Sequence, residues 1–134
     1  MPAPHWYDYA IVRVVPRPER EEFLNVGAIV SSASAKFLAA RVELDEARLH
    51  AFDPCVDVEA VATHLAAIVR ICQGGADSGP IGQLGQRERF RWLTAQRSAV
   101  IQTSAVHLGR CNDPADALDH LVATMVRTRK PGHG

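Results

Sequence analysis

The chain has 134 residues, of which 47% are hydrophobic and 22% charged, a composition typical of one globular domain that completes its core without a metal or a disulfide. Its 15 basic side chains balance its 15 acidic ones, so no net charge draws the protein toward nucleic acid or an anionic membrane, and we expect neither as a partner. The sequence has no apolar run of about 18 residues, which excludes an evident membrane-spanning helix.

The charge balance hides an asymmetry between the two halves of the chain. Residues 1–60 carry 6 basic and 10 acidic side chains, whereas residues 61–134 carry 9 and 5. If the halves form separate surfaces, the molecule is dipolar and its charge favours docking to a partner. If they interleave in one sheet, the asymmetry has little effect.

Cysteine and histidine are spread along the chain. Cys55, Cys72 and Cys111 form no Cys-x-x-Cys pair, and no two histidines have the spacing of a helical metal site. We therefore expect no metal and no cofactor, and three free thiols in a reducing compartment. The first residues lack the basic and apolar segments of a secretory signal, so we expect a cytoplasmic protein.

Two alternating strands are predicted between residues 7 and 30. In the first, Tyr9, Ile11 and Arg13 share one face, while the residues between them form a second apolar face, so the strand is covered on both sides. Pro16 and Pro18 end it. Residues 19–22 then form a loop or a single helical turn.

The second strand is expected to place residues 23, 25, 27 and 29 on one face and residues 24, 26, 28 and 30 on the other. Gly27 has no side chain, which indicates a bulge or the close approach of another backbone. A small-residue turn at 31–35 leads to a third strand over 36–43. The three strands together predict an antiparallel meander.

Helical patterns follow the meander. Asp45 is placed to cap a short helix that ends near residue 51. Apolar residues recur at helical spacing from Val58 to Cys72, the clearest amphipathic pattern of the chain. Residues 74–86 are rich in glycine but lack the spacing and the Gly-Lys-Ser/Thr ending of a phosphate loop, so we predict a flexible connection.

The last third of the chain predicts a helix, a strand and a helix. For residues 87–94, an amphipathic helical turn with Phe90 and Leu93 inward is favoured over a short strand. Residues 98–107 alternate and are rich in β-forming types, which predicts a fourth strand. Asp113 and Pro114 mark the start of a helix over 115–129.

These elements predict an α+β fold in a single domain spanning residues 1–134, with an ordered core from about residue 7 to 130. We expect an antiparallel sheet of about four strands, the N-terminal meander plus the C-terminal strand. The two main helices, over 58–72 and 115–129, are expected to pack on one face of this sheet.

Arg13 is the polar residue that most needs an explanation, because a guanidinium in an apolar strand requires a partner. An ion pair with a glutamate at position 19, 21 or 22 is the preferred reading, and a bound carboxylate or phosphate is the alternative. Asn25 can bind Arg13, a backbone group or a ligand, and an internal bond to backbone is the commonest outcome.

A second polar group surrounds the predicted fourth strand. Arg97 and His107 flank it, and Gln102 and Ser104 lie within it. A serine three residues before a histidine is a weak sign of nucleophilic catalysis, because no Gly-x-Ser-x-Gly turn and no orienting acid accompany it. We therefore assign no catalytic residue. The candidate binding cluster comprises Arg13, Glu22, Asn25, Arg97, Gln102, Ser104 and His107.

Arg87, Arg89 and Arg91 alternate with Phe90 and Trp92, which has the composition of a small nucleic-acid patch. Three arginines in a neutral protein are a weak signal, so a solvated helix face is the preferred reading.

The chain resembles a bacterial family known as domain of unknown function 3037. The likeness spans about residues 7–126 and is carried by the runs Tyr9 to Pro16, Glu19 to Gly27 and Arg89 to Ala95, with Arg97, Val106 and His107. The resemblance implies a small protein of no established activity. Many members are encoded beside HipA-like kinases, which implies an association with a toxin–antitoxin system.

Two functional hypotheses follow. The first is a non-enzymatic interaction module that is a partner or regulator of a HipA-like kinase, and it is favoured because catalytic signatures are missing. The second is a small hydrolase or nucleotide- or anion-binding enzyme, in which Arg13 and Arg97 hold an anion while His107 or Glu22 acts as acid or base. The second hypothesis requires these side chains to converge.

Overall fold

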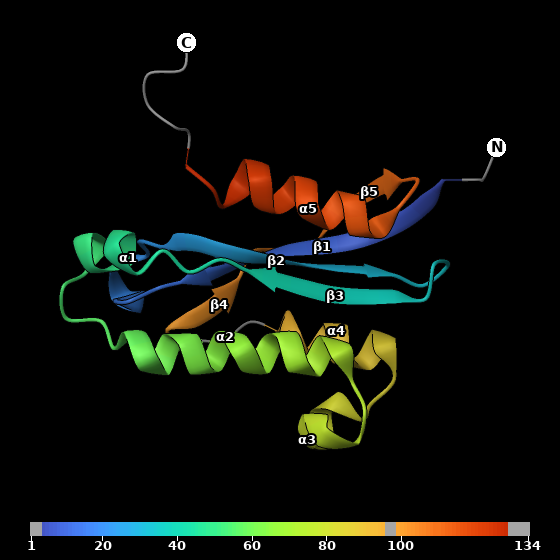
Figure 1. Ribbon diagram of the computed structural model, residues 1–134, viewed down its shortest axis with the longest axis horizontal. Helices are drawn as coiled ribbons and strands as arrows, with labels where there is room; N and C mark the ends of the chain where they lie inside the picture. The colour runs from blue at the N-terminus through green and yellow to red at the C-terminus, as the bar shows by residue number, and fades with distance from the viewer. Residues whose placement is uncertain (1–3, 96–98, 129–134) are drawn as a thin grey trace, which may run out of the picture.

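The computed structural model describes residues 4–95 and 99–128, which form one sheet flanked by helices (Figure 1). The elements in chain order are β1 (His5–Val14), η1 (Pro18–Arg20), β2 (Leu24–Ser32), β3 (Phe37–Val42), α1 (Glu46–Phe52), α2 (Val58–Gln73), η2 (Ala76–Ser78), α3 (Gly79–Gly82), α4 (Gln86–Leu93), β4 (Ile101–Thr103), β5 (His107–Cys111) and α5 (Pro114–Met125). The predicted α+β class, with an antiparallel sheet, is confirmed.

The sheet has five strands in the order β3-β2-β1-β4, and β5 also pairs with β1. β4 pairs with the Val12–Val14 end of β1, and β5 pairs with the His5–Tyr9 end. Between them, Ser104 binds Ile11 twice, through its own backbone N–H and through its hydroxyl, each at 2.8 Å. Of the single strand predicted over 98–107, only Ile101–Thr103 form β4, and the separate strand β5 was not predicted. The backbone N–H of Ile11 donates to the Ser104 hydroxyl and not to a backbone carbonyl, so the ladder along this side of β1 is interrupted between β4 and β5.

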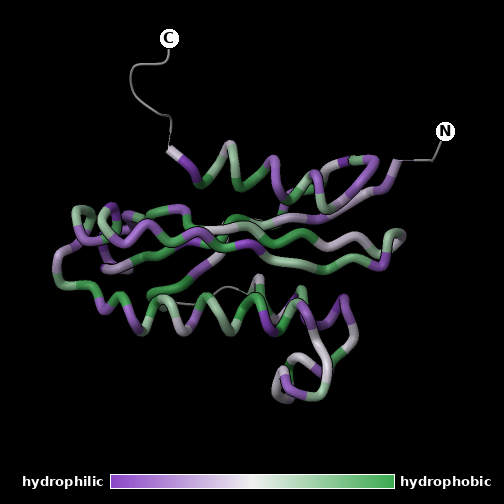
Figure 2. Tube along the Cα trace, in the orientation of Figure 1, coloured by the Kyte–Doolittle hydropathy of each residue, from purple (hydrophilic) through white to green (hydrophobic). Residues whose placement is uncertain are grey.

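The main helices lie on opposite faces of the sheet, so the prediction of one shared face is wrong (Figure 1). Successive strand residues point to opposite faces, and both faces of β1 and β2 are apolar. An apolar face of the sheet is stable only when other residues shield it from water. Helices on one side of the sheet would leave the opposite apolar face exposed. Val12, Ile29 and Leu65 belong to the cluster under α2, whereas Ile11, Val30 and Leu118 belong to the cluster under α5. In Figure 2, hydrophobic residues follow the central strands and alternate with hydrophilic ones along α2.

A bulge in β2 corrects the predicted faces of that strand. Val12 pairs with Gly27 and Arg13 pairs with Asn25, which leaves Val26 as an extra residue. Asn25 consequently shares the α5 face with Ala28 and Val30, not the face of Gly27 and Ile29. A Cβ atom at Gly27 would lie 2.5 Å from the carbonyl oxygen of Arg41 on β3, so the close backbone approach predicted for this glycine is present.

The starts of α1 and α5 match the predicted residues Asp45 and Asp113, whereas the cap of α2, Asp57, was not predicted. The carboxylates of Asp45, Asp57 and Asp113 accept backbone N–H bonds at the starts of α1, α2 and α5. α5 ends at Met125, four residues before the predicted end. The glycine-rich segment 74–86 contains η2 and α3. Within the residues described, no helix has both the length and the apolar character needed to cross a membrane.

Candidate functional site

Arg13, Asn25 and Gln102 form a polar row across three neighbouring strands. Arg13 on β1 pairs in register with Asn25 on β2 and with Gln102 on β4. Residues opposite each other in a sheet have their Cβ atoms about 5 Å apart, so the structure brings these three predicted site residues together on the face that carries α5.

The guanidinium of Arg13 makes no ion pair within the part of the chain that is described, so the predicted pairing with a nearby glutamate is wrong. Glu19 pairs with Arg17 and Glu22 with Arg20 inside the same turn. Arg13 instead stacks on Phe23, its Cζ atom 3.9 Å from the ring centroid. Its Nε atom is buried without a hydrogen-bond partner among the described residues.

Asn25 makes the internal backbone bond that was predicted. Its side-chain Nδ2 donates to the carbonyl of Met125, the last residue of α5, at 3.0 Å. Its Oδ1 atom is buried and accepts no bond from the described residues. Gln102 donates from Nε2 to the carbonyl of Ala99 at 2.8 Å. The row thus contains a buried donor, Arg13 Nε, and a buried acceptor, Asn25 Oδ1, that have no partner among the described residues.

The other predicted members do not join this row. His107 pairs with Tyr9 and stacks on its ring at 5.3 Å. At about 3.3 Å per strand residue, the four steps from Tyr9 to Arg13 place His107 about 13 Å from Arg13. This separation exceeds the contact distances that shared acid–base chemistry requires. Arg97 lies outside the described residues.

Ser104 and Glu22 have structural contacts. The Ser104 hydroxyl accepts from the backbone of Ile11 and donates to the carbonyl of Ala105 at 2.9 Å, which leaves it no histidine to activate it. Glu22 is exposed, and its hydrogen bond with Arg20 lowers the pKa of its carboxyl group. Neither side chain makes a hydrogen bond with a residue of the polar row.

The arginines of α4 also support the fold. Arg87 forms an ion pair with Asp8 of β1 at 2.6 Å. Arg89 donates to the carbonyls of Ile71, Cys72 and Leu84, which closes the end of α2 and the loop behind it. Phe90 and Leu93 are buried, as the amphipathic helix predicted.

The three thiols differ sharply in environment. Burial raises the pKa of Cys72 to about 12. Desolvation, together with the charge of Asp113, raises the pKa of Cys111. Cys55 is exposed. Among the described residues, no three His, Cys, Asp or Glu side chains are arranged to hold a metal ion.

The sequence did not reveal an exposed surface at one edge of the sheet, which we term the β5 edge. It consists of the outer side of β5 together with Trp6, Leu108 and Arg110. Trp6 is 55% exposed and Leu108 63% exposed. The guanidinium of Arg110 lies over the Trp6 ring, with 4.9 Å between Cζ and the centroid. The signal was weak because β5 is short, contains a glycine and follows directly after another predicted strand.

The two edges of the sheet differ in how they are covered. β3, at one edge, packs against both α2 and α5, and its Arg41 pairs with Asp119 of α5. β5, at the other edge, pairs only with β1 among the described strands, and β1 is the element against which it packs extensively. An edge strand has main-chain donors and acceptors available to another strand. The β5 edge therefore combines free hydrogen-bonding groups with exposed apolar side chains.

Comparison with known proteins identifies the family. No curated protein and no solved structure matches the chain significantly. The model of the family described as "Protein of unknown function (DUF3037)" matches residues 9–126, which include the polar row and the β5 edge except for Trp6. Because the match covers most of the chain, this protein belongs to the DUF3037 family.

Proposed function

We propose that this protein is a non-enzymatic interaction module that binds a partner protein at the β5 edge. One observation carries the proposal. The strand β5, whose outer side pairs with no described strand, lies next to two large exposed apolar side chains, Trp6 and Leu108. Tryptophan and arginine dominate the energetics of protein interfaces, and Arg110 is already stacked on Trp6.

Strand addition is the binding mode that fits this surface. An extended segment of the partner forms main-chain hydrogen bonds with β5, and every second side chain of that segment packs beside Leu108 and Arg110, with Trp6 behind Arg110 on β1. Arg110 makes no ion pair with a described residue, so an acidic residue in the segment is favoured. A five-residue edge supports a small interface of about micromolar affinity.

The family resemblance makes a cytoplasmic HipA-like kinase the first partner to test. Such a kinase would be held or regulated through its own extended segment, with no chemistry required of the module. This interpretation is supported by Ser104 and Glu22, whose side chains are occupied by bonds to Ile11 and Arg20.

The experiment is co-expression with a HipA-like kinase encoded beside the gene, followed by pull-down and titration calorimetry. We expect a complex at micromolar concentrations. Replacement of Leu108→Asp places a charge on the edge and should weaken the complex at least about tenfold, because an unpaired carboxylate must lose its hydration.

The matched control is Leu84→Asp, since Leu84 is also exposed and apolar but lies between α3 and α4, away from β5. This variant should bind like the wild type. Absence of a complex removes the kinase as partner. A complex that both variants form equally well removes the β5 edge as the docking surface.

A further inference from the structure

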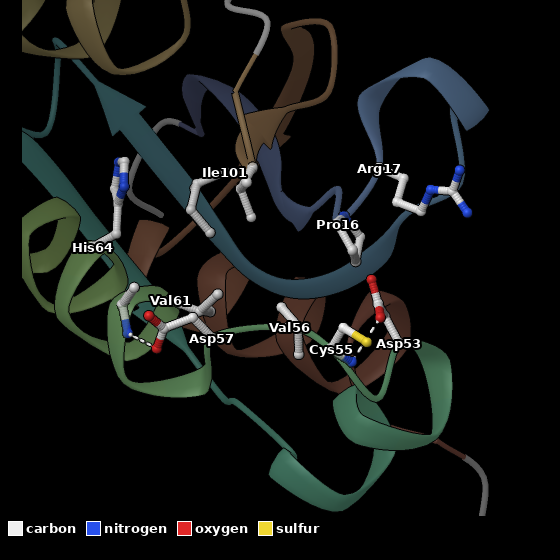
Figure 3. A pocket seen from close by; sticks show the side chains of 11 residues that line it. Pro16, Arg17, Asp53, Cys55, Val56, Asp57, Val61, His64 and Ile101 are labelled. Carbon is white, nitrogen blue, oxygen red and sulfur yellow. Dashed lines mark hydrogen bonds between the residues drawn. The ribbon is translucent and has the colours of Figure 1, made fainter.

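A cavity of about 550 Å³ lies beside the first turns of α2 (Figure 3). Its walls are the loop after β1, the connection from α1 to α2, the start of α2 and the residues that lead into β4. Cavities of this size accept ligands with one or two rings. The cavity shares no lining residue with the polar row or the β5 edge.

The floor of the cavity is apolar and belongs to the core. Val61 and Ile101 line it, and both are buried members of the cluster under α2. Val56 completes the floor from the α1–α2 connection. The backbone N–H of Val15 donates to the carbonyl of Val100 at 2.6 Å, which attaches the β4 wall to the end of β1. Because the floor is part of a packed core, the cavity is formed before any ligand arrives.

Two carboxylates stand at its rim, on either side of Cys55 and Val56 (Figure 3). Asp53 accepts from the backbone N–H of Cys55 through Oδ1 at 2.9 Å, and Asp57 accepts from Ala60 through Oδ1 at 3.0 Å. These bonds fix the orientation of both groups. Neither Oδ2 atom accepts a hydrogen bond from the described part of the chain, so each carboxylate retains an acceptor for a ligand.

The rim is negative. Among the described lining residues the one permanent cation is Arg17, whose side chain is 61% exposed and pairs with Glu19 at 2.9 Å. In Figure 3 its guanidinium points away from the cavity. His64, the remaining ionisable group of the lining besides the Cys55 thiol, stands on the far side of Asp57. Two aspartates therefore set the charge at the mouth of an apolar hollow.

We infer that this cavity binds a small organic cation, an ammonium or amidinium group attached to an apolar body. The body lies on Val56, Val61 and Ile101, and the cationic group donates to the Oδ2 atom of Asp53 or of Asp57, the two carboxylates at opposite ends of the rim. An anion of the same size is excluded by these carboxylates. The site is distinct from the β5 edge, and the inference does not depend on the interaction function.

The first test is a titration of 15N-labelled protein with 2-phenylethylammonium. We expect chemical-shift changes confined to the cavity residues and a dissociation constant of about 1 mM or tighter. Two further probes separate the contribution of the charge from that of the aromatic ring. The alcohol 2-phenylethanol keeps the ring without the charge, and methylammonium keeps the charge without the ring. Both should bind at least about tenfold more weakly.

The second test removes the charges while keeping the local structure. Asparagine caps helices and forms Asx turns as well as aspartate does, so the double variant Asp53→Asn/Asp57→Asn should fold normally. It should bind 2-phenylethylammonium as weakly as wild type binds the alcohol. Asp113→Asn, which alters the cap of α5 outside the cavity, is the matched control and should bind like wild type.

Cys55 supplies an independent readout because its exposed thiol lines the same cavity. Saturating 2-phenylethylammonium should slow alkylation of Cys55 in wild type but not in the double variant. The inference is overturned if the alcohol or methylammonium binds as tightly as the amine. It is equally overturned if the double variant retains wild-type affinity, or if no shifts appear at about 10 mM amine.

Discussion

Arg13 shows how a single residue can be conspicuous in the sequence and yet have little structural bonding. Its stem lies in β1, its guanidinium stacks on Phe23, and its buried Nε atom has no acceptor among the described residues. A buried donor without a partner costs about 1–3 kcal/mol. Asn25, paired with Arg13 across the strands, has a buried Oδ1 atom that likewise has no partner among the described residues.

We therefore expect Arg13→Met to change the free energy of unfolding by less than about 1 kcal/mol, because the lost stacking on Phe23 is offset by removal of an unsatisfied donor. Arg89→Met is the matched comparison. Arg89 donates to three backbone carbonyls, so its loss should cost about 2–4 kcal/mol. Urea unfolding of both variants measures the difference. Equal losses would show that Arg13 has structural bonds comparable to those of Arg89.

At the scale of elements, the end of α5 is held by side chains from three other segments. Asn25 of β2 binds the carbonyl of Met125, and Arg48 of α1 binds the carbonyl of Val126 at 3.2 Å. Glu43, directly after β3, holds Arg127 through two bonds of 2.8 and 2.7 Å. Terminal carbonyls of a helix need partners, and Asn25 and Arg48 supply them at the end of α5, while the Glu43–Arg127 pair holds the residue that follows.

The contact between Glu43 and Arg127 predicts a pH dependence. The hydrogen bond from Arg127 lowers the pKa of Glu43 below its ordinary value of 4.5. A carboxylate with a lowered folded-state pKa stabilises the fold above the ordinary value and loses this contribution as the pH falls through the folded-state pKa. Both side chains are partly or largely exposed, so the effect is modest and weakens with salt.

Glu43→Gln should therefore be less stable than wild type at neutral pH, and the difference should vanish well below pH 4.5. The difference in stability is measured from urea unfolding midpoints at low salt, from neutral pH to well below pH 4.5. Glu21→Gln, which removes an exposed glutamate in the turn between β1 and β2, should leave the pH profile of wild type almost unchanged. A constant difference between Glu43→Gln and wild type at every pH would contradict the assigned ion pair.

At the scale of the molecule, the two halves of the sequence interleave. β1 pairs with β4 and β5 from the second half, and α5 packs on β2 and β3 from the first. Ion pairs join the halves at Asp8 with Arg87, Arg41 with Asp119, and Glu43 with Arg127. The charge asymmetry along the sequence therefore does not correspond to two separate halves of the fold.

The same interleaving predicts one cooperative unfolding transition, although the protein has two apolar clusters. Leu65→Ala acts on the cluster under α2 and Leu118→Ala on the cluster under α5. Each should lower the free energy of unfolding by about 2–5 kcal/mol. Both should shift the same transition in fluorescence and circular dichroism, because β1 and β2 contribute to both clusters. Separate transitions by the two probes would show that the clusters fold independently.

Local signals in the sequence account for the helices and the meander. Asp45, Asp57 and Asp113 cap helices because a short carboxylate reaches the first free N–H groups whatever lies around it. The apolar period of α2 and the alternation of β1 are likewise properties of neighbouring residues. These features predicted the α+β class and most element boundaries.

The sequence by itself determined that β1 must be covered on both faces and that Gly27 marks a bulge or a close backbone approach. Only the tertiary structure decided which helix covers which face, that Val26 bulges and moves Asn25 beside Arg13, and that Ser104 divides the edge strand. Only the structure also showed that Asp53 and Asp57 line the same cavity as Ile101. Each of these outcomes depends on contacts between residues far apart in the chain, which local periodicity and capping do not encode.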